Sequence, residues 1–308
     1  MNTKLIEDIA SAVLYEGYLL YPYRASALKN QQRWNFGVLY PRAYAEQQSG
    51  ADAWWSQTEC LVRADSDAKL SVRVRFLQLG WQAKAPAPLR ANVGQAFSPA
   101  NPAHERDITL SSLRLSELAA HPSRLQFTQP LDALIEAEAT PIDRNLYKIR
   151  ISVSNISPCS AATRDEALIH SLVSAHSIIG IEGGEFVSLL DPPDELRDFA
   201  AACQNVGTWP VLVGEDGRRD AMLSSPIILY DYPKIAPESP GALFDGTEID
   251  EILTLRILTL TDEEKREISC SDERARQILE RTESMPAEQF MKMHGVVRCL
   301  KEVQEQMP

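Results

Sequence analysis

Residues 145–156, Asn-Leu-Tyr-Lys-Ile-Arg-Ile-Ser-Val-Ser-Asn-Ile, carry the most regular pattern in this chain. Tyr147, Ile149, Ile151 and Val153 alternate with Lys, Arg and Ser residues. Successive side chains of a β-strand point to opposite faces of a sheet, so this period of two predicts a strand with one buried face. The Ser-Asn-Ile-Ser-Pro sequence that follows is typical of a turn.

The same alternation occurs nearer the N-terminus, in residues 69–79, where the apolar positions are Leu70, Val72, Val74 and Phe76. Residues 54–63 predict another strand before it. The sequence Ala-Asp-Ser-Asp-Ala between the two supplies residues that favour a turn. We therefore expect a pair of strands joined at this point.

Further strands are expected later in the chain. Residues 166–190 predict one or two apolar strands, with Glu182-Gly-Gly-Glu185 as a hairpin turn because glycine accepts positive φ. Residues 194–203 predict a short helix with proline near its start. Two more strands are predicted at Trp209–Val213 and Ile227–Tyr230.

The remaining part before residue 145 is less regular. Residues 2–14 predict an amphipathic helix, because their apolar side chains recur at helical spacing. The sequence Trp34-Asn-Phe-Gly-Val-Leu-Tyr predicts a strand that ends at Pro41. Residues 83–107 are rich in Pro and Ala and predict a long surface connection.

These elements predict an α+β protein with two domains. Residues 1–233 are expected to form a β-rich, antiparallel, sandwich-like domain with an N-terminal helix. A Pro-rich bridge with Pro233, Pro237 and Pro240 follows, which cannot be helix interior. Helix-capping signals recur beyond it, so residues 234–308 are expected to form this bridge and a helical C-terminal region.

Composition is typical of a soluble globular protein. The chain has 308 residues, of which 44% are hydrophobic and 24% are charged. Its net charge of −12 argues against general binding to nucleic acid, which needs a basic face. The sequence has neither a signal peptide nor a run of apolar residues long enough for a membrane span, so a cytoplasmic location is expected.

Five scattered cysteines, none in a Cys-x-x-Cys pair, favour reduced thiols over disulfides or a metal site. His170 and His176 would lie about 20 Å apart on a straight strand, too far for one metal ion, so they are interpreted as structural. No Gly-x-Ser-x-Gly elbow is present. The sequence therefore assigns no catalytic residue, no metal ligand and no cofactor.

The segment between residues 15 and 36 has the most unusual composition, because aromatic rings surround three cations in it. Its candidate partner-binding residues are Tyr15, Tyr18, Tyr21, Tyr23, Arg24, Lys29, Asn30, Arg33 and Trp34. Tyr, Trp and Arg carry much of the binding energy at protein interfaces. Three interpretations remain open: a structural segment with internally paired arginines, a protein-binding surface, or a site for a small anionic ligand.

Three blocks of sequence resemble one bacterial protein family. They begin at Val13 (Val-Leu-Tyr-Glu-Gly-Tyr-Leu-Leu-Tyr-Pro-Tyr-Arg), at Gly183 (Gly-Gly-Glu-Phe-Val-Ser-Leu-Leu-Asp-Pro-Pro) and at Ser225 (Ser-Pro-Ile-Ile-Leu-Tyr-Asp-Tyr-Pro). This uncharacterised family is associated with the gene clusters of nickel–iron ([NiFe]) hydrogenases. The resemblance extends over most of the chain and implies a role in making, assembling or accompanying such an enzyme.

The family supplies no catalytic residues, and the nickel-binding cysteine pairs of a hydrogenase are absent from this sequence. The resulting hypothesis is a non-catalytic accessory or assembly protein that binds a [NiFe]-hydrogenase subunit or maturation factor. The alternative is an enzyme that acts on a small anionic substrate in a cleft lined by residues 15–36. In that case Tyr23, Arg24, Lys29 and Arg33 would hold the substrate.

Overall fold

The structure, a computed structural model, describes most of the chain up to Lys234 and a few residues beyond it: 3–14, 37–48, 52–79, 103–128, 131–234, 261–262, 265–266, 279–280 and 283–284. The chain divides into two compact units. The first consists of Met1–Tyr18 and Ser26–Lys234, and the second of Leu19–Ala25 and Ile235–Pro308.

The described helices and strands all lie in the first unit, apart from short helical fragments in the second. The helices are α1 (Thr3–Leu14), α2 (Arg42–Ala45), α3 (Leu115–Ala120), α4 (Arg164–Ile169), the 3-10 helix η2 (Asp194–Leu196) and α5 (Arg197–Ala201). The strands are β1 (Trp55–Leu79), β2 (Ala103–Arg114), β3 (Ser123–Thr128), β4 (Asp132–Asp143), β5 (Leu146–Asn155), β6 (Val173–Val187), β7 (Trp209–Leu212) and β8 (Ala221–Ser225). No helix among these residues is long and apolar enough to cross a membrane.

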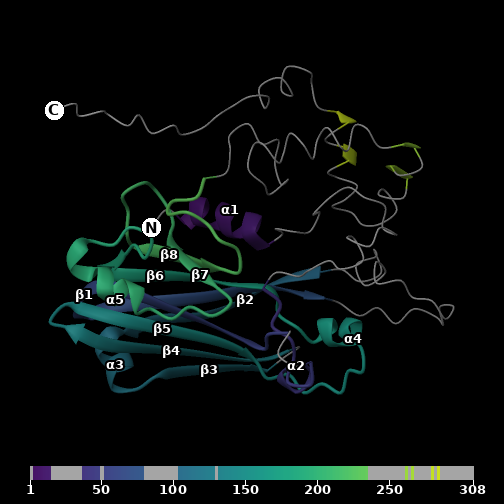
Figure 1. Cartoon of the computed structure of the whole chain (residues 1–308), viewed down its shortest axis with the longest axis horizontal. Helices are drawn as coiled ribbons and strands as arrows, with labels where there is room; N and C mark the ends of the chain where they lie inside the picture. The colour runs from purple at the N-terminus through teal and green to yellow at the C-terminus, as the bar shows by residue number, and fades with distance from the viewer. Residues whose placement is uncertain are drawn as a thin grey trace. The chain divides into compact units, whose positions relative to one another are not determined.

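The eight described strands form one antiparallel sheet in the order β3-β4-β5-β1-β6-β8-β7, with β2 paired to β1 (Figure 1). The 25-residue strand β1 organises this sheet. Its first half pairs with β5 and its second half with β2, while β6 pairs with both halves along the other edge. The predicted β-rich, antiparallel architecture is therefore confirmed.

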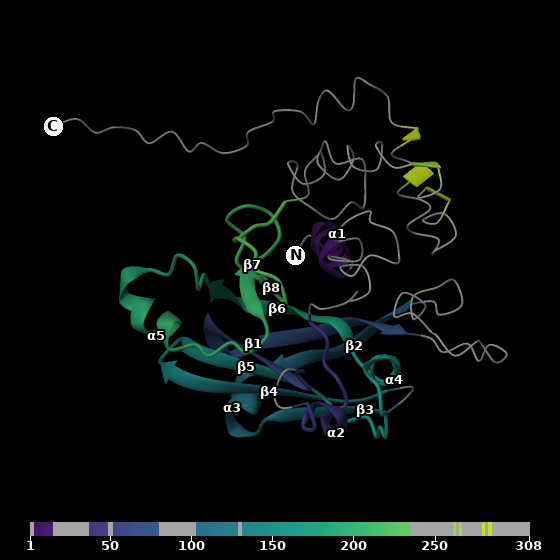
Figure 2. The ribbon, with the colours of Figure 1, turned by 45° about the vertical axis from the view of Figure 1, so that its right-hand side comes forward.

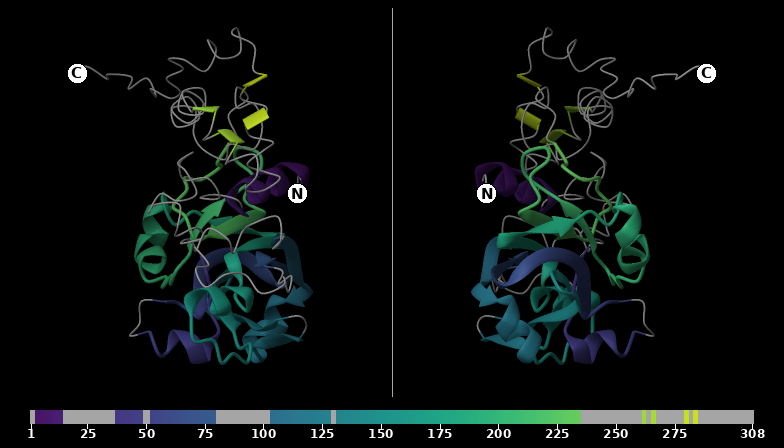
Figure 3. Two further views of the ribbon diagram at one scale, coloured as in Figure 1. Left: turned by 90° about the vertical axis from the view of Figure 1, so that its right-hand side faces the viewer. Right: turned by 90° about the vertical axis from the view of Figure 1, so that its left-hand side faces the viewer.

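The main core lies on one face of this sheet. Ile149 and Ile151 of β5, predicted to be buried by their alternation, are at most 1% exposed. Side chains of β2 and β3, which are not paired with each other, contact the same core through Ile108 and Phe127. The strongly curved β1, the dark blue arch in the right-hand view of Figure 3, lets the sheet wrap around this core.

Helix α1 covers the opposite face of β6 and β8 (Figure 2). Its buried residues Ile6, Ile9 and Val13 recur at intervals of three or four, as the sequence predicts for an amphipathic helix. They pack against Ile178 of β6 and Leu223 of β8. The expected helix over residues 2–14 is confirmed, with its first described residue at Thr3.

Two predicted turns are wrong. Residues 65–67 do not join two strands, because β1 continues through them, and Glu182-Gly-Gly-Glu185 lies inside β6. The two segments lie opposite each other: Ala64 pairs with Gly184 and Lys69 with Glu182. The turn-forming residues thus build a bulge that bends two continuous strands, instead of two hairpins.

Gly184 is required where these strands approach each other. A Cβ atom at this position would lie 2.6 Å from the Cβ of Ala64 and 3.1 Å from the carbonyl oxygen of Arg63. We expect Gly184→Ala to lower the free energy of unfolding by about 2–3 kcal/mol, because the strands must separate. Urea denaturation of both proteins measures this difference.

Gly183→Ala is the comparison. Gly183 has a φ of +81°, but its nearest neighbour to an added Cβ lies 3.7 Å away, so only backbone strain of about 1 kcal/mol is expected. A smaller loss of stability for Gly184→Ala than for Gly183→Ala would contradict the close contact described here.

Other expectations are corrected at the ends of the sheet. Residues 164–169 form helix α4, not a strand, because Thr163 and Glu166 make a capping box. Strand β2 begins at Ala103, inside the predicted surface connection. Residues 227–230 are not a strand either, because β8 ends before Pro226, which has no N–H to donate to a ladder.

The remaining predictions in this region are confirmed. The short helix expected at 194–203 is present as η2 and α5, preceded by Pro193. The strand expected at Trp209–Val213 is β7. In the second unit, the described residues include a buried Leu279 and an ion pair of 2.8 Å between Lys265 Nζ and Glu283 Oε1. The predicted helical C-terminal region otherwise falls outside the described residues.

Candidate functional site

The candidate partner-binding residues, from Tyr15 to Trp34, lie outside the described residues. The chain on either side of them is described. Ser174 Oγ donates a hydrogen bond of 3.3 Å to the carbonyl oxygen of Val13. The amide of Ala175 donates one of 2.9 Å to the carbonyl oxygen of Gly37. The two flanks of residues 15–36 are therefore bound to adjacent residues of β6.

The C-terminal flank is fixed by several further contacts. Leu39 and Leu172 exchange two backbone hydrogen bonds, of 2.9 and 3.1 Å. Gly37 has a φ of +59°, and a Cβ there would lie 2.4 Å from Pro226. The fully buried Asn155 donates from Nδ2 to the carbonyl oxygen of Leu39 at 2.8 Å. This flank is thus fixed to the packed domain through an isolated β-bridge, although its described residues, 37–40, form no strand.

The N-terminal flank is fixed by ion pairs between α1 and the sheet. Glu7 of α1 pairs with both Arg73 and Arg75 of β1. Arg75 also donates to the carboxylate of Asp107 in β2, at 2.9 and 3.2 Å. Its third contact is Ser11 Oγ of α1, at 3.3 Å. Arg75 therefore joins the helix to two strands.

Burial gives these ion pairs more weight than surface pairs have. The Arg75 side chain is 10% exposed, and that of Glu7 is 28% exposed. Burial raises the pKa of Asp107, but the hydrogen bonds and charge of Arg75, with the charge of Arg73, outweigh it and hold this pKa below its usual range. The charged carboxylates of Glu7 and Asp107 are both needed as partners of the largely buried Arg75 guanidinium.

His176 lies opposite Arg75 in the ladder between β1 and β6. Its Nδ1 is 2.9 Å from the carbonyl oxygen of Ser174, while within the described part of the chain its Nε2 has no hydrogen-bond partner. Burial, with smaller contributions from the positive charges of Arg75 and Arg73, lowers the pKa of His176 to about 4 against the opposing effects of Ser174 and Asp107. The imidazole is therefore neutral in the folded protein at neutral pH.

This shift predicts how stability depends on pH. The unfolded chain binds a proton at His176 below about pH 6.5, whereas the folded chain does so only below about pH 4. The unfolded state binds more protons in this window, so stability falls as the pH falls. We expect His176 to contribute a loss of about 2.5 kcal/mol between about pH 7.5 and 4.5, measured by urea denaturation at each pH.

His176→Leu is the matched variant, because it removes the titrating group and keeps a buried side chain. Carboxylates titrate in both proteins, so the difference between their pH profiles isolates the histidine. Parallel profiles above pH 4.5 would show that His176 is not responsible.

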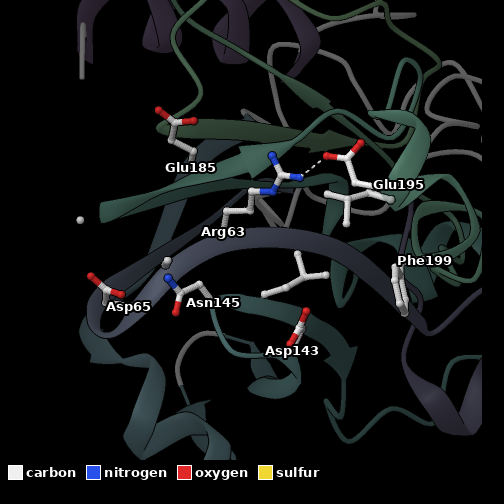
Figure 4. Close-up of a pocket in the computed structure, with 11 residues that line it drawn as sticks. Arg63, Asp65, Asp143, Asn145, Glu185, Glu195 and Phe199 are labelled. Atoms are coloured by element: carbon white, nitrogen blue, oxygen red, sulfur yellow. Dashed lines mark hydrogen bonds and ion pairs between the residues drawn. The ribbon is translucent and has the colours of Figure 1, made fainter.

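A separate cleft lies at the bulge between β1 and β6, with a volume of about 590 Å³ (Figure 4). It is lined by Arg63, Ala64, Asp65, Asp143, Asn145, Leu146, Gly183, Glu185, Glu195, Leu196 and Phe199. We call it the acidic cleft. The sequence does not predict this cleft, because its lining residues come from six separate elements and one turn.

Arg63 is the one cation among the lining residues, and it reaches toward Glu195 (Figure 4). Its guanidinium lies 2.6 Å from Glu195 Oε1. Both side chains are about half exposed or more, so solvent screens the pair and it contributes little to stability. The cleft attracts cations and repels anions.

Two of the described thiols, Cys60 and Cys203, are poorly suited to nucleophilic chemistry. Burial raises the pKa of Cys60 above its ordinary range, and the nearby Cys203 and Glu59 raise it further. Burial and Glu59 raise the pKa of Cys203 to about 11. Among the residues described, no group of three or more His, Cys, Asp or Glu side chains is arranged to hold a metal ion.

No protein-family model and no curated protein sequence matches this chain.

Proposed function

We propose that this protein is a non-catalytic accessory or assembly protein, in which residues 15–36 form the surface that binds a protein partner. The partner is a subunit or a maturation factor of a [NiFe] hydrogenase, and binding takes place in the cytoplasm. The resemblance of three sequence blocks to a hydrogenase-associated family supplies the identity of the partner. The composition of residues 15–36 supplies the kind of interaction.

One structural observation supports this proposal above the others. Both flanks of residues 15–36 are hydrogen-bonded to Ser174 and Ala175, adjacent residues of a central strand. A binding segment held at both ends by a packed sheet loses less conformational freedom on association than a free tail does. The ion pairs of Glu7 with Arg73 and Arg75 stabilise the helix that leads into it.

The alternative, an enzyme for a small anionic substrate, has less support from the described residues. The acidic cleft carries Asp65, Asp143, Glu185 and Glu195 against a single arginine, so it disfavours an anion. Such an enzyme would instead need a cleft built by residues 15–36 themselves, with perturbed titratable groups converging on it.

The proposal is tested by affinity purification of the tagged full-length chain from its native host, with mass spectrometry and metal analysis of the same sample. We expect hydrogenase subunits or maturation proteins to be recovered in stoichiometric amounts. Recovery of the chain alone would contradict the proposal, and a small anion bound to it would favour the enzyme.

A further inference from the structure

The acidic cleft combines an apolar floor with an acidic rim. Leu146 of β5 and Leu196 of η2 are buried beneath it, and Phe199 of α5 is 42% exposed. The carboxylates come from separate elements: Asp65 from β1 and Glu185 from β6, with Asp143 and Glu195 from β4 and η2. In Figure 4, Asp65 and Asn145 lie at one end of the cleft and Phe199 at the other.

The charges on the rim do not balance. Glu195 is paired with Arg63, which leaves Asp65, Asp143 and Glu185 without a cation among the lining residues. All three side chains are exposed. A group that fills this cleft must therefore bring positive charge, and it must also cover apolar surface.

Lysine and arginine side chains have both properties, because an apolar stem carries a cationic head. The volume of about 590 Å³ is within the range of sites that hold a few side chains or a small ligand. The net charge of −12 would also steer a basic segment toward the protein. Charge complementarity thus selects a basic peptide over an anion, a nucleic acid or a purely apolar chain.

We infer that the acidic cleft docks a basic segment of a protein partner, as a second contact in addition to the one proposed for residues 15–36. The stems of its Lys or Arg residues cover Phe199, the exposed apolar side chain of the cleft. Their cationic heads bind Asp65 and Glu185 at the rim. This inference rests on the proposed function only in assigning the segment to the same partner.

The test uses a short fluorescently labelled peptide of alternating Lys and Leu, with full-length protein and fluorescence anisotropy at low ionic strength. The variant Asp65→Asn with Glu185→Gln removes two exposed charges without disturbing the core. We expect it to bind the peptide about tenfold more weakly. A peptide with Glu in place of Lys should not bind.

Two controls separate the cleft from the overall negative charge. Asp8→Asn with Glu117→Gln removes two exposed carboxylates that do not line the cleft, and should change the affinity less than about twofold. Phe199→Ala changes no charge and should weaken binding about threefold through lost apolar contact.

Three results would overturn the inference: no binding of the Lys–Leu peptide to the wild-type chain, an equal loss of affinity in the Asp8/Glu117 variant, or no effect of Phe199→Ala. A dimer in light scattering that the Asp65/Glu185 variant dissociates would mean that a second copy occupies the cleft, and would overturn it as well. These results concern the acidic cleft and do not contradict the proposed function of residues 15–36. That function fails separately if the purification from the native host recovers no partner.

Discussion

Asn155→Ala is expected to lower the free energy of unfolding by about 4 kcal/mol. The amide of Asn155 is fully buried and makes three hydrogen bonds: to the carbonyl oxygens of Leu39 and His170, each at 2.8 Å, and from the amide of Ser157 at 3.0 Å. Alanine removes the Asn155 partner of the His170 carbonyl and of the Ser157 amide, and one of the two donors to the Leu39 carbonyl, which keeps the Leu172 amide. An unsatisfied buried group costs about 1–3 kcal/mol, and the cavity left by the side chain adds to this loss. Urea denaturation measures the change.

The loss should also be local. Hydrogen exchange of the Leu39 and Leu172 amides, which bond each other's carbonyls, should accelerate more than exchange in β4 and β5. Asn145→Ala is the matched control, because Asn145 is exposed in the turn before β5, and we expect a change below about 0.5 kcal/mol. A loss below about 1 kcal/mol for Asn155→Ala would contradict the role assigned to this side chain.

Arg75→Leu is the second variant with a large expected effect, a loss of about 3 kcal/mol. It removes the cation between Glu7 and Asp107 and leaves both carboxylates partly buried without it. Removing one partner of a buried pair typically costs about 3–5 kcal/mol, and the partial exposure of the two carboxylates places the expected value at the lower end. Urea denaturation of the variant and the wild type measures this loss in the free energy of unfolding.

Helix α1 should detach more readily in this variant. Relative to the wild type, hydrogen exchange should therefore accelerate more for the amides of α1 than for those of β6. Arg106→Leu is the control: Arg106 is also an arginine at the β1–β2 pair, but it is exposed and bonds only Gln78 among the described residues, at 2.9 Å. We expect it to change stability by less than about 0.5 kcal/mol. Equal losses for Arg75→Leu and Arg106→Leu would show that burial of the network is unimportant.

The sequence predicts the strands that have one buried and one polar face. Ile149 and Val153 in β5, and Val72 and Val74 in β1, alternate with polar residues and are all buried. The sequence does not predict strand β8, Ala221–Ser225, because this strand is buried on both faces and shows no alternation. Turn-forming residues at 65–67 were also misleading, because Asp and Ser serve equally in a bulge.

The contacts that fix the flanks of the candidate site could not be predicted from the sequence, for a different reason. Arg73 and Arg75 occupy the polar positions of an alternating strand, which predicts a solvent-facing side. The structure instead places Glu7 of α1 against them, and sequence periodicity does not say which helix covers which face. Ser174, with a φ of +53° at a register shift, has no distinctive sequence signal.

The most direct test of the partner-binding claim is the affinity of the recovered partner for three forms of the full-length protein. These are the wild type, Arg24→Ala with Arg33→Ala, and a control, Arg124→Ala with Arg219→Ala, that removes two exposed arginines elsewhere. We predict a loss of affinity of at least about tenfold for the Arg24/Arg33 variant and no loss for the Arg124/Arg219 control. The melting temperature of both variants should equal that of the wild type. Unchanged affinity of the Arg24/Arg33 variant, or a large fall in its melting temperature with normal affinity of the folded fraction, would contradict the claim.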